Sequence, residues 1–372
     1  MISATATSAI VRYGFNVADK RTFKLSSGAE QRVDNLFGRI TFNNLTPDTE
    51  YTLSGPLADP VKFRTQKPAD GKLLFKAGVI SDPHITLFPD NVMRLHTRSV
   101  STTAALVKKF NVDKVDFIFV AGDLTDRGRP SEVDAAAAVF KNAEMPVFIT
   151  RGNHDNVASS KAGSDTGSGK DFEYIIHKGV KFDQSEWIKR FGRPSGLVIR
   201  NGVQIAWLNT PFGVLDLPEN VDVISKIDEK LPLVIFSHYQ LVPDDHIAPA
   251  DKSSVIVETR GTKSFTEAPE GAGKLLKKLA RCKGLILVGH KNIASSAKLG
   301  SMTQINLPQP TQYPTGAVAL DVYDNGARLT FVPAGEAYAE EYTRRRTAES
   351  VRRMKHRTRY SLPVWNQFIS WQ

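Results

Sequence analysis

Two hydrophobic patterns divide the chain into a short N-terminal part and a longer C-terminal part. In residues 1–66, short runs of alternating apolar and polar residues are separated by Gly, Asn, Asp and Pro. This alternation predicts β-strands with one buried face. From residue 73 onward, continuous apolar runs such as 73–80 alternate with segments of helical periodicity. Buried strands that alternate with helices predict a largely parallel α/β sheet.

The second pattern predicts five buried strands, each followed by polar residues. The apolar runs that predict these strands are 73–80, 115–121, 146–151, 231–237 and 284–288. Helical patterns lie at 93–110, 131–143, 219–229 and 271–282. Asn201-Gly202 predicts a hairpin turn within 196–208. Further β-structure is expected at 303–307, 317–323 and 327–332.

The change of pattern sets the domain boundaries that we predict. A polar linker with Pro and Gly at 67–72 separates a small β-sandwich, 1–66, from an α/β domain, 73–335. A basic helix and an aromatic tail are expected over 336–372. A chain of 372 residues has room for this number of domains.

Two insertions interrupt the α/β pattern. Residues 159–170 are rich in Gly and Ser and predict a loop, which could be either a lid over a site or a disordered surface segment. Residues 240–270 form a second long insertion that could shape a substrate pocket.

Composition excludes several classes of protein. The chain is 41% hydrophobic and 24% charged, as a globular protein is. It contains no apolar run long enough to span a bilayer and no recognisable signal peptide, so we expect a cytoplasmic protein without a membrane partner. Its single cysteine, Cys282, excludes an internal disulfide and is interpreted as a small buried hydrophobe.

The net charge of +10 is concentrated near the C-terminus. Residues 344–359 hold eight Arg or Lys and one acidic residue, Glu349. This run could be a solvated helix face or a nucleic-acid contact. The aromatic tail after it, 363–371, is expected to pack on its own domain, on a second subunit of a homo-oligomer or on a partner protein.

Side chains that can bind metals or move protons follow all five predicted buried strands. They are Asp82, His84, Asp123, Asp126, Asn153, His154, Asp155, His238, His290 and Asn292. Sites in open α/β sheets form beyond the carboxyl ends of strands, so these residues are expected to converge. Taken singly, each could be a packed histidine, a helix cap or a turn residue. Carboxylates, imidazoles and amides without thiolates suit Mn²⁺, Fe or Zn²⁺.

The order of these clusters resembles the calcineurin-like metallophosphoesterase superfamily, and most closely its phosphodiesterase-like branch. The motifs are Asp-x-His, Gly-Asp-x-x-Asp, Gly-Asn-His-Asp, a single His and Gly-His, over roughly 73–333. The resemblance implies a four-layer α/β/β/α sandwich with two mixed sheets packed face to face. It also implies hydrolysis of a phosphomonoester or phosphodiester by a hydroxide activated between two divalent ions. Mn²⁺ is the first choice for these ions, and Fe or Zn²⁺ are the alternatives.

The resemblance further implies a role for each residue. The first metal would be bound by Asp82, His84 and Asp123, and the second by Asp123, Asn153, His238 and His290. His154 would face the substrate and either stabilise the transition state or protonate the leaving oxygen. Asp155 or Asp126 would orient His154. The family's last motif usually ends in a second His, and Asn292 in its place predicts weaker binding of the first metal.

Gly122–Gly128 also resembles the signature of the serine/threonine phosphatases. It makes Arg127 either a phosphate contact or the partner of Asp126 in a surface ion pair. The expected substrate is a phosphorylated small molecule, a nucleotide or a nucleic acid. Two other functions stay open: a nuclease that uses the basic run, and an assembly protein with a degenerate phosphoesterase core.

The N-terminal part carries a separate resemblance. Asn44–Tyr51 is similar to the Leu-x-Pro-x-Thr-x-Tyr corner of fibronectin type III domains, in which the tyrosine hydroxyl bonds to the backbone. Because 66 residues are few for that fold, we expect a strand to be missing or degenerate.

Overall fold

The structure is a computed structural model. It describes residues 2–89, 94–156, 185–211, 213–242, 270–291, 294–335, 337–354 and 362–371. The predicted lid at 159–170, most of the 240–270 insertion, Asn292 and the end of the basic run lie outside the described residues.

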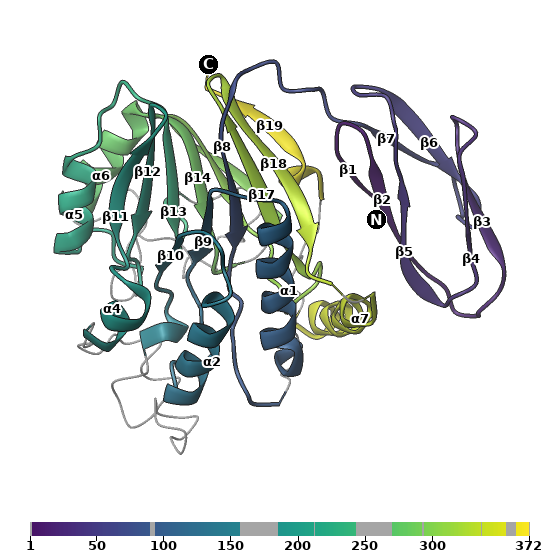
Figure 1. The fold of residues 1–372 in the computed structure, drawn as a ribbon, viewed down its shortest axis with the longest axis horizontal. Coiled ribbons are helices and arrows are strands. Elements are labelled where there is room, and N and C mark those ends of the chain that lie inside the picture. The colour runs from purple at the N-terminus through teal and green to yellow at the C-terminus, as the bar shows by residue number, and fades with distance from the viewer. Residues whose placement is uncertain are drawn as a thin grey trace.

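The N-terminal part is all-β, and its strands form two sheets (Figure 1). One sheet has the order β1-β2-β5, with β1 (Ile2–Ala4), β2 (Ala9–Gly14) and β5 (Phe37–Phe42). The other has the order β4-β3-β6-β7, with β3 (Arg21–Leu25), β4 (Glu30–Val33), β6 (Glu50–Ser54) and β7 (Val61–Arg64). Phe23 and Leu53 belong to the buried cluster of this part of the chain.

The short N-terminal segment thus forms a three-stranded sheet and a four-stranded sheet. This is possible in so short a segment because strands such as β1, with three residues, and β7, with four, are short. The corner at Asn44–Tyr51 forms, because the backbone N–H of Thr46 donates a hydrogen bond to the Tyr51 hydroxyl at 2.8 Å. This bond fixes the loop that leads into β6.

The C-terminal part contains two mixed six-stranded sheets. The first has the order β10-β9-β8-β17-β18-β19 and comprises β8 (Leu73–Ile80), β9 (Phe117–Ala121), β10 (Val147–Thr150), β17 (Gly316–Tyr323), β18 (Gly326–Pro333) and β19 (Gln367–Ser370). The second has the order β11-β12-β13-β14-β16-β15 and comprises β11 (Gly196–Arg200), β12 (Val203–Leu208), β13 (Leu233–Ser237), β14 (Lys283–Val288), β15 (Ser296–Leu299) and β16 (Ser301–Asn306). β8, β9 and β10 run parallel, as do β12, β13, β14 and β16.

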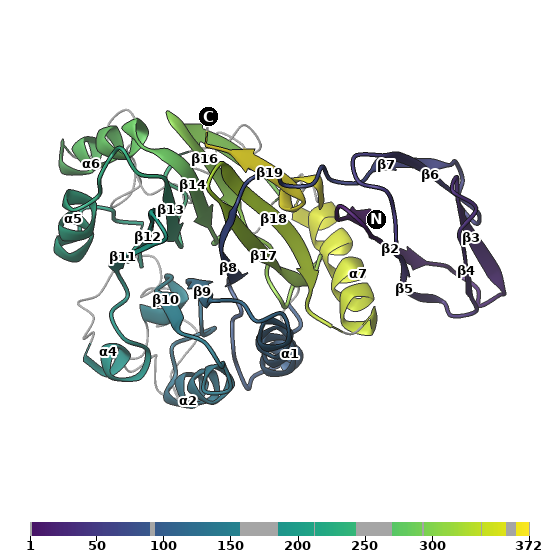
Figure 2. The same cartoon turned by 45° about the horizontal axis from the view of Figure 1, so that its top comes forward.

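The two sheets pack face to face, and helices cover their outer faces (Figure 2). The rings of Phe119 and Phe236, one from each sheet, stack with centroids 3.8 Å apart. Helices α1 (Ser99–Val112), α2 (Pro130–Phe140) and α4 (Ser185–Phe191) contribute to the cluster on the first sheet. Helices α5 (Pro218–Ser225) and α6 (Glu270–Arg281) contribute to the cluster on the second. Both sheets are thus buried on two faces, which explains the continuous apolar runs.

The helix expected at 93–110 begins later than the sequence pattern suggests. A 3₁₀ turn, η1 (His96–Arg98), precedes α1. The carbonyl of Thr311 accepts a hydrogen bond from the N–H of Leu95 at 2.8 Å and holds this approach in place.

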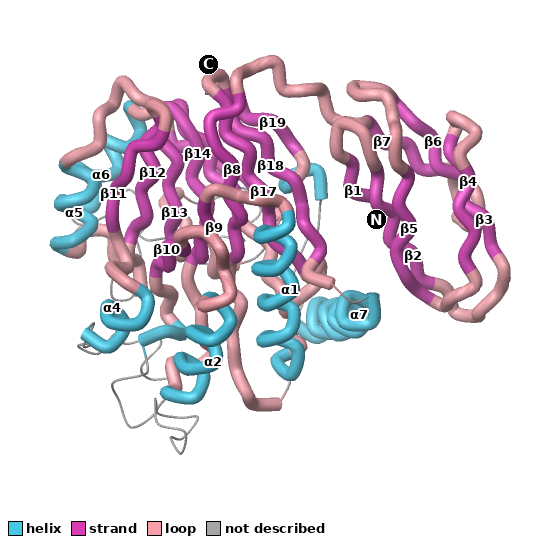
Figure 3. The backbone as a smooth tube through the Cα atoms, viewed as in Figure 1, coloured by secondary structure: helices cyan, strands magenta, loops and turns pink. Residues whose placement is uncertain are grey.

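The aromatic tail packs on its own domain. Strand β19 pairs with β18 (Figure 3). Trp365 and Trp371 are both buried, in a hydrophobic cluster that contains residues of both sheets. The indole N–H of Trp365 donates a hydrogen bond to the carbonyl of Asn306. Of the three alternatives for this tail, packing on its own domain is the one that the structure shows, and nothing in the described residues supports a protein partner or homo-oligomer through the tail.

Helix α7 (Ala337–Met354) contacts the N-terminal sheets through acidic residues in its first turns. Glu340 pairs with Arg12 at 3.0 Å and also with Arg39, and Glu341 pairs with Arg12. Glu341 in turn binds Arg344 and Arg345. Two of the basic residues thus have partners inside the chain.

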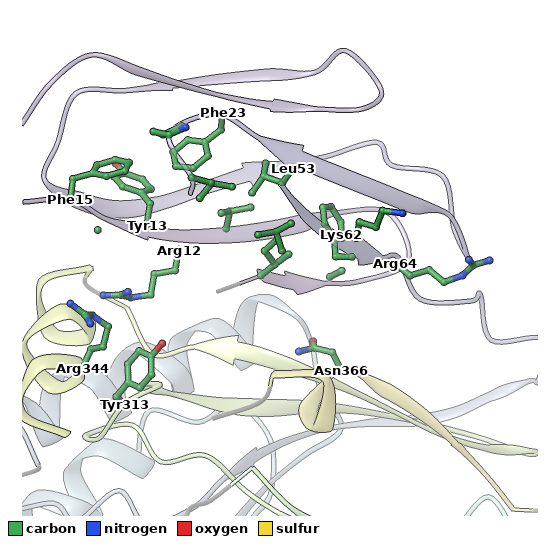
Figure 4. A pocket seen from close by; sticks show the side chains of 18 of the residues that line it. Arg12, Tyr13, Phe15, Phe23, Leu53, Lys62, Arg64, Tyr313, Arg344 and Asn366 are labelled. Atoms are coloured by element: carbon green, nitrogen blue, oxygen red, sulfur yellow. The ribbon is translucent and has the colours of Figure 1, made fainter. Parts of the chain in front are cut away.

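A cavity of about 770 Å³ lies beside this contact (Figure 4). Arg12, Tyr313, Arg344 and Asn366 line it, and the Arg12 guanidinium carbon lies 5.6 Å from the ring centroid of Tyr313.

None of the described helices is long and apolar enough to cross a membrane.

Replacing Trp365 with Ala should lower the free energy of unfolding by about 3–5 kcal/mol, because a fully buried indole and its hydrogen bond are lost. Urea denaturation measures this change. Val112→Ala, at a side chain that is 69% exposed, should stay within about 0.5 kcal/mol of wild type. Equal midpoints for the two variants would show that the tail is not part of the core.

Candidate metal centre

The five predicted strand ends meet at one edge of the two packed sheets (Figure 1). The first sheet supplies the loops after β8, β9 and β10, and the second supplies those after β13 and β14. The structure brings together ten of the eleven residues singled out from the sequence, and the eleventh, Asn292, is not described.

The backbone at this edge is strained where the side chains gather. Asp82, His84, Asp123 and His290 all have positive φ values, between 44° and 66°. This left-handed region is unfavourable for residues with a Cβ, and such residues cluster at functional sites. Gly152 is required beside them, because a Cβ there would lie 2.1 Å from the Asp123 Oδ1 atom.

Three side chains form a tight group from both sheets. The Asn153 Oδ1 atom lies 3.0 Å from His238 Nε2 and 3.1 Å from His290 Nδ1, and the two ring nitrogens are 3.3 Å apart. Ligand atoms about 2.1 Å from one ion lie roughly 3.0–3.4 Å from their neighbours in octahedral or tetrahedral geometry. The group therefore has the spacing of metal ligands.

A second group surrounds His84. Its Nε2 atom lies 3.6 Å from Asp123 Oδ2 and 3.9 Å from Asp82 Oδ1. The His84 ring is fully buried, and neither of its ring nitrogens makes a hydrogen bond within the described part of the chain. A buried ring nitrogen between two carboxylates fits a divalent cation, which would accept its lone pair.

Asp123 stands between the two groups. Its Oδ2 atom faces His84, and its Oδ1 atom lies 3.3 Å from His238 Nε2. The N–H of His154 also donates a hydrogen bond to Oδ1 at 2.9 Å. Burial raises the pKa of Asp123, but the imidazoles of His238, His154 and His84 outweigh it and hold this pKa well below its ordinary value. The carboxyl group is therefore ionised and can bind cations on both sides.

A backbone carbonyl fixes the ring nitrogen that His238 presents to the site, and a ring stack orients His290. His238 Nδ1 lies 3.1 Å from the Ala121 carbonyl oxygen, which can only accept, so Nδ1 carries a proton and Nε2 faces the site. Burial alone would lower the pKa of His238, but the neighbouring carboxylate of Asp123 outweighs this effect and raises the pKa to about 9. The ring of His290 stacks on Tyr239 with centroids 4.2 Å apart, which turns Nδ1 toward Asn153.

His154 points into the site and is held by a main-chain group. Its Nδ1 atom donates a hydrogen bond to the Asp126 carbonyl oxygen at 2.6 Å. The Asp126 carboxylate is farther away, 3.8 Å from the same nitrogen. Asp126 therefore orients His154 mainly through its backbone carbonyl, which lies closer to the ring than its carboxylate does.

Asp155 ties two site loops together. Its carboxylate accepts hydrogen bonds from the N–H groups of Gly152, Leu124 and Thr125, at 2.9, 3.1 and 2.8 Å, and from the Thr125 hydroxyl at 2.8 Å. Burial and the nearby Asp123 raise the pKa of Asp155 to about 6 despite these donors. These contacts give Asp155 a loop-positioning role that the sequence did not suggest.

The surroundings of Asp126 include two residues that the sequence analysis missed. Its Oδ1 atom lies 3.3 Å from His96 Nε2, 3.3 Å from His84 Nδ1 and 3.5 Å from an Arg94 guanidinium nitrogen. Arg127 Nε lies 3.6 Å from the other carboxylate oxygen. Arg94 and His96 fall in a segment interpreted only as helical, and no motif marks them.

Two mixed sheets with buried Asp, His and Asn side chains at one edge define an α/β protein with a candidate centre for divalent cations. The sequence match identifies it more narrowly. Residues 75–301 match the family described as calcineurin-like phosphoesterase, and the chain belongs to this family.

A curated relative from Fibrobacter succinogenes, a probable cyclic nucleotide phosphodiesterase, is 33% identical over 86 residues. That match spans 23% of this chain and only 33% of the relative.

Two solved structures are similar in fold. A dimetal phosphatase from Danio rerio has 11% identity and a TM-score of 0.47, covering 71% of this chain and 98% of its own. A purple acid phosphatase from yellow lupin has 12% identity and a TM-score of 0.45, covering 90% of this chain and 72% of its own.

Asp155→Ala should destabilise the protein by about 2–4 kcal/mol, because three buried N–H groups lose their acceptor. Urea denaturation of the metal-free protein gives the value. Asp222→Ala, which removes an exposed carboxylate paired with Lys226, is the matched control and should cost less than about 1 kcal/mol. A loss for Asp155→Ala no larger than the control would contradict the loop-positioning role.

Proposed function

We propose that the protein hydrolyses a phosphoester at a centre of two divalent cations bridged by Asp123. The observation that carries the proposal is the position of this carboxylate, with Oδ1 beside His238 and Oδ2 beside His84. The family match supports phosphoester hydrolysis as the reaction class and divalent cations as its cofactors.

Two ligand sets follow from this arrangement. The first cation would be held by Asp82, His84 and Asp123, and the second by Asp123, Asn153, His238 and His290. Asn292 would be a weak further ligand of the first. When bound, the cations would supply Lewis acidity that activates water and neutralises charge on the phosphoryl oxygens. Mn²⁺ is our first choice, and Fe or Zn²⁺ would also suit these ligands.

The remaining side chains would act on the substrate. His154 Nδ1 donates to the Asp126 carbonyl, so Nε2 faces the substrate, and in the protonated ring Nε2 is the atom that would give its proton to the leaving oxygen. The Arg127 side chain, 35% exposed beside Asp126, would hold a phosphoryl oxygen. Asp155 would keep the Gly152 and Leu124 loops in register.

A phosphodiester, including that of a nucleotide, is our preferred substrate, and the similarity to the probable cyclic nucleotide phosphodiesterase of F. succinogenes supports it. Two of the eight basic residues on which the nuclease alternative depends, Arg344 and Arg345, already pair with Glu341. The assembly alternative loses support because the aromatic tail is buried in its own domain. A buried ligand set with strained backbone favours an enzyme over an assembly protein.

The architecture is part of the same proposal. We interpret the helix-covered pair of sheets as the four-layer sandwich over 73–335, preceded by a fibronectin III-like domain over 1–66. The sheet orders β1-β2-β5 and β4-β3-β6-β7 and the Tyr51 hydrogen bond support this interpretation of the N-terminal part.

Replacing His154 with Ala should lower the rate in proportion to the leaving group's need for a proton. With Mn²⁺, kcat should fall about 100-fold or more for an alkyl phosphodiester and much less for bis(p-nitrophenyl) phosphate, whose leaving group departs without protonation. Steady-state kinetics of both substrates and the metal content of the same samples test this.

The metal content separates the outcomes. His154→Ala should keep two ions per chain, whereas His238→Ala should lose one. Equal rate losses for both substrates would remove His154 as the proton donor. Wild-type protein that holds no metal and shows no turnover would refute the two-cation reaction.

Metal uptake should also release a proton from His238. Because its pKa in the metal-free protein is about 9, the ring is charged at pH 7 and must lose a proton before Nε2 can bind a cation. Mn²⁺ affinity should therefore rise with pH up to about 9 and level off above it. Calorimetry at pH 7 in two buffers of different ionisation enthalpy should give about one proton released.

The same shift has a consequence for stability. The pKa of His238 in the folded protein lies above its ordinary value of 6.5. The contribution of its charged ring to the stability of the metal-free protein is therefore complete below pH 6.5 and is lost as pH rises through 9. A proton release of zero, or a metal-free stability that increases over this range, would contradict the assignment.

A further inference from the structure

The carboxylate of Asp126 links one proposed metal ligand to two residues outside every site motif. Its Oδ1 atom lies 3.3 Å from His84 Nδ1 on one side, and it is 3.3 Å from His96 Nε2 and 3.5 Å from an Arg94 nitrogen on the other. The side chains of Asp126 and His96 are only 7% and 5% exposed. Contacts at this depth are poorly screened by solvent.

His96 itself is fixed from its other ring nitrogen. Nδ1 lies 3.1 Å from the Pro89 carbonyl oxygen and Nε2 lies 3.3 Å from a carboxylate oxygen of Asp126, and because both oxygens only accept, the protonated ring, with a hydrogen on each nitrogen, is the form that can donate to both. This contact turns Nε2 toward Asp126. The N–H of Leu95, hydrogen-bonded to the Thr311 carbonyl, anchors the backbone between Arg94 and His96.

The effect on His84 follows from electrostatics. A carboxylate beside Nδ1 favours the proton on that nitrogen and leaves the Nε2 lone pair facing Asp82 and Asp123. An Asp126 side chain that is free to rotate would lose this control over the ring. Arg94 and His96 are positively polarised groups placed to prevent that rotation.

We propose that His96, assisted by Arg94, is a positioning residue that holds Asp126 so that His84 presents Nε2 to the first cation. The inference rests on the proposed function, because it assumes that His84 binds a cation. It assigns the 94–96 segment, which touches no phosphoryl group in the mechanism above, a role in metal affinity.

Two amide variants separate positioning from packing. In His96→Gln the amide nitrogen can occupy the place of Nε2 and still donate to Asp126. In His96→Asn it can reach only the place of Nδ1, so the Pro89 contact survives and the Asp126 contact is lost. A purely structural role for His96 gives no reason for the longer amide to rescue the function.

The measurement is a calorimetric Mn²⁺ titration of chelator-treated full-length protein, with His84→Ala used to identify the binding step that depends on His84. That step should weaken about tenfold in His96→Asn and stay within about threefold of wild type in His96→Gln, since partners of metal ligands commonly contribute 10–100-fold in affinity. The other step should not change.

Arg94→Met provides a second variant that leaves the His96 ring intact, and Arg98→Met, at an exposed neighbour in η1, is its matched control. Only Arg94→Met should weaken the His84-dependent step. Thermal denaturation of each metal-free variant verifies folding. If His96→Asn does not fold, the comparison of Arg94→Met with Arg98→Met tests the inference.

Three results would overturn the inference. Equal Mn²⁺ affinities for His96→Asn and His96→Gln would leave His96 a packing residue only. Wild-type affinity in both His96→Asn and Arg94→Met, with two ions bound, would refute the positioning role alone. A wild-type protein that binds no Mn²⁺ would refute the proposed function and this inference with it.

Discussion

The stack of Phe119 on Phe236 sets the distance across which the candidate site is built. These rings join β9 of one sheet to β13 of the other, with centroids 3.8 Å apart and planes 9° from parallel. Just beyond the ends of these two strands, a carboxylate oxygen of Asp123 and the Nε2 atom of His238 lie 3.3 Å apart. Because close-packed interiors transmit small shifts, a change in the sheet spacing would move the two halves of the site apart.

That packing also explains how so many polar groups stay buried together. Ionised carboxylates and orphaned ring nitrogens are costly away from water. Here Asp123 offsets part of the cost by favouring the charged form of His238, and carbonyls such as that of Ala121 satisfy the outer ring nitrogens. The positive φ values at Asp82, His84 and His290 add backbone strain. Bound cations would recover much of this energy, so this arrangement of side chains is better suited to metal binding than to stability.

Sequence patterns predicted the parts of the fold that depend on local chemistry. The run at 73–80 became β8 with the same limits, and the Asn201-Gly202 turn joins β11 to β12. The residues at the strand ends converged because parallel strands deliver their loops to one edge. The patterns did not reveal His96 or the loop-joining bonds of Asp155, because those depend on which side chains meet across loops. Periodicity carries no information about such contacts.

The basic run shows the same limit for charge. Counting residues 344–359 gives an almost purely positive segment, but Glu340 and Glu341 lie directly before it. One helical turn places Arg344 and Arg345 against Glu341, and the fold adds Arg12 from the N-terminal part. These arginines hold the pKa of Glu341 at about 2, although burial alone would raise it. The start of the helix is therefore an ion-pair junction between the two parts of the chain. Its acidic and basic side chains partly compensate each other, which leaves less positive charge at the start of the helix for a nucleic acid.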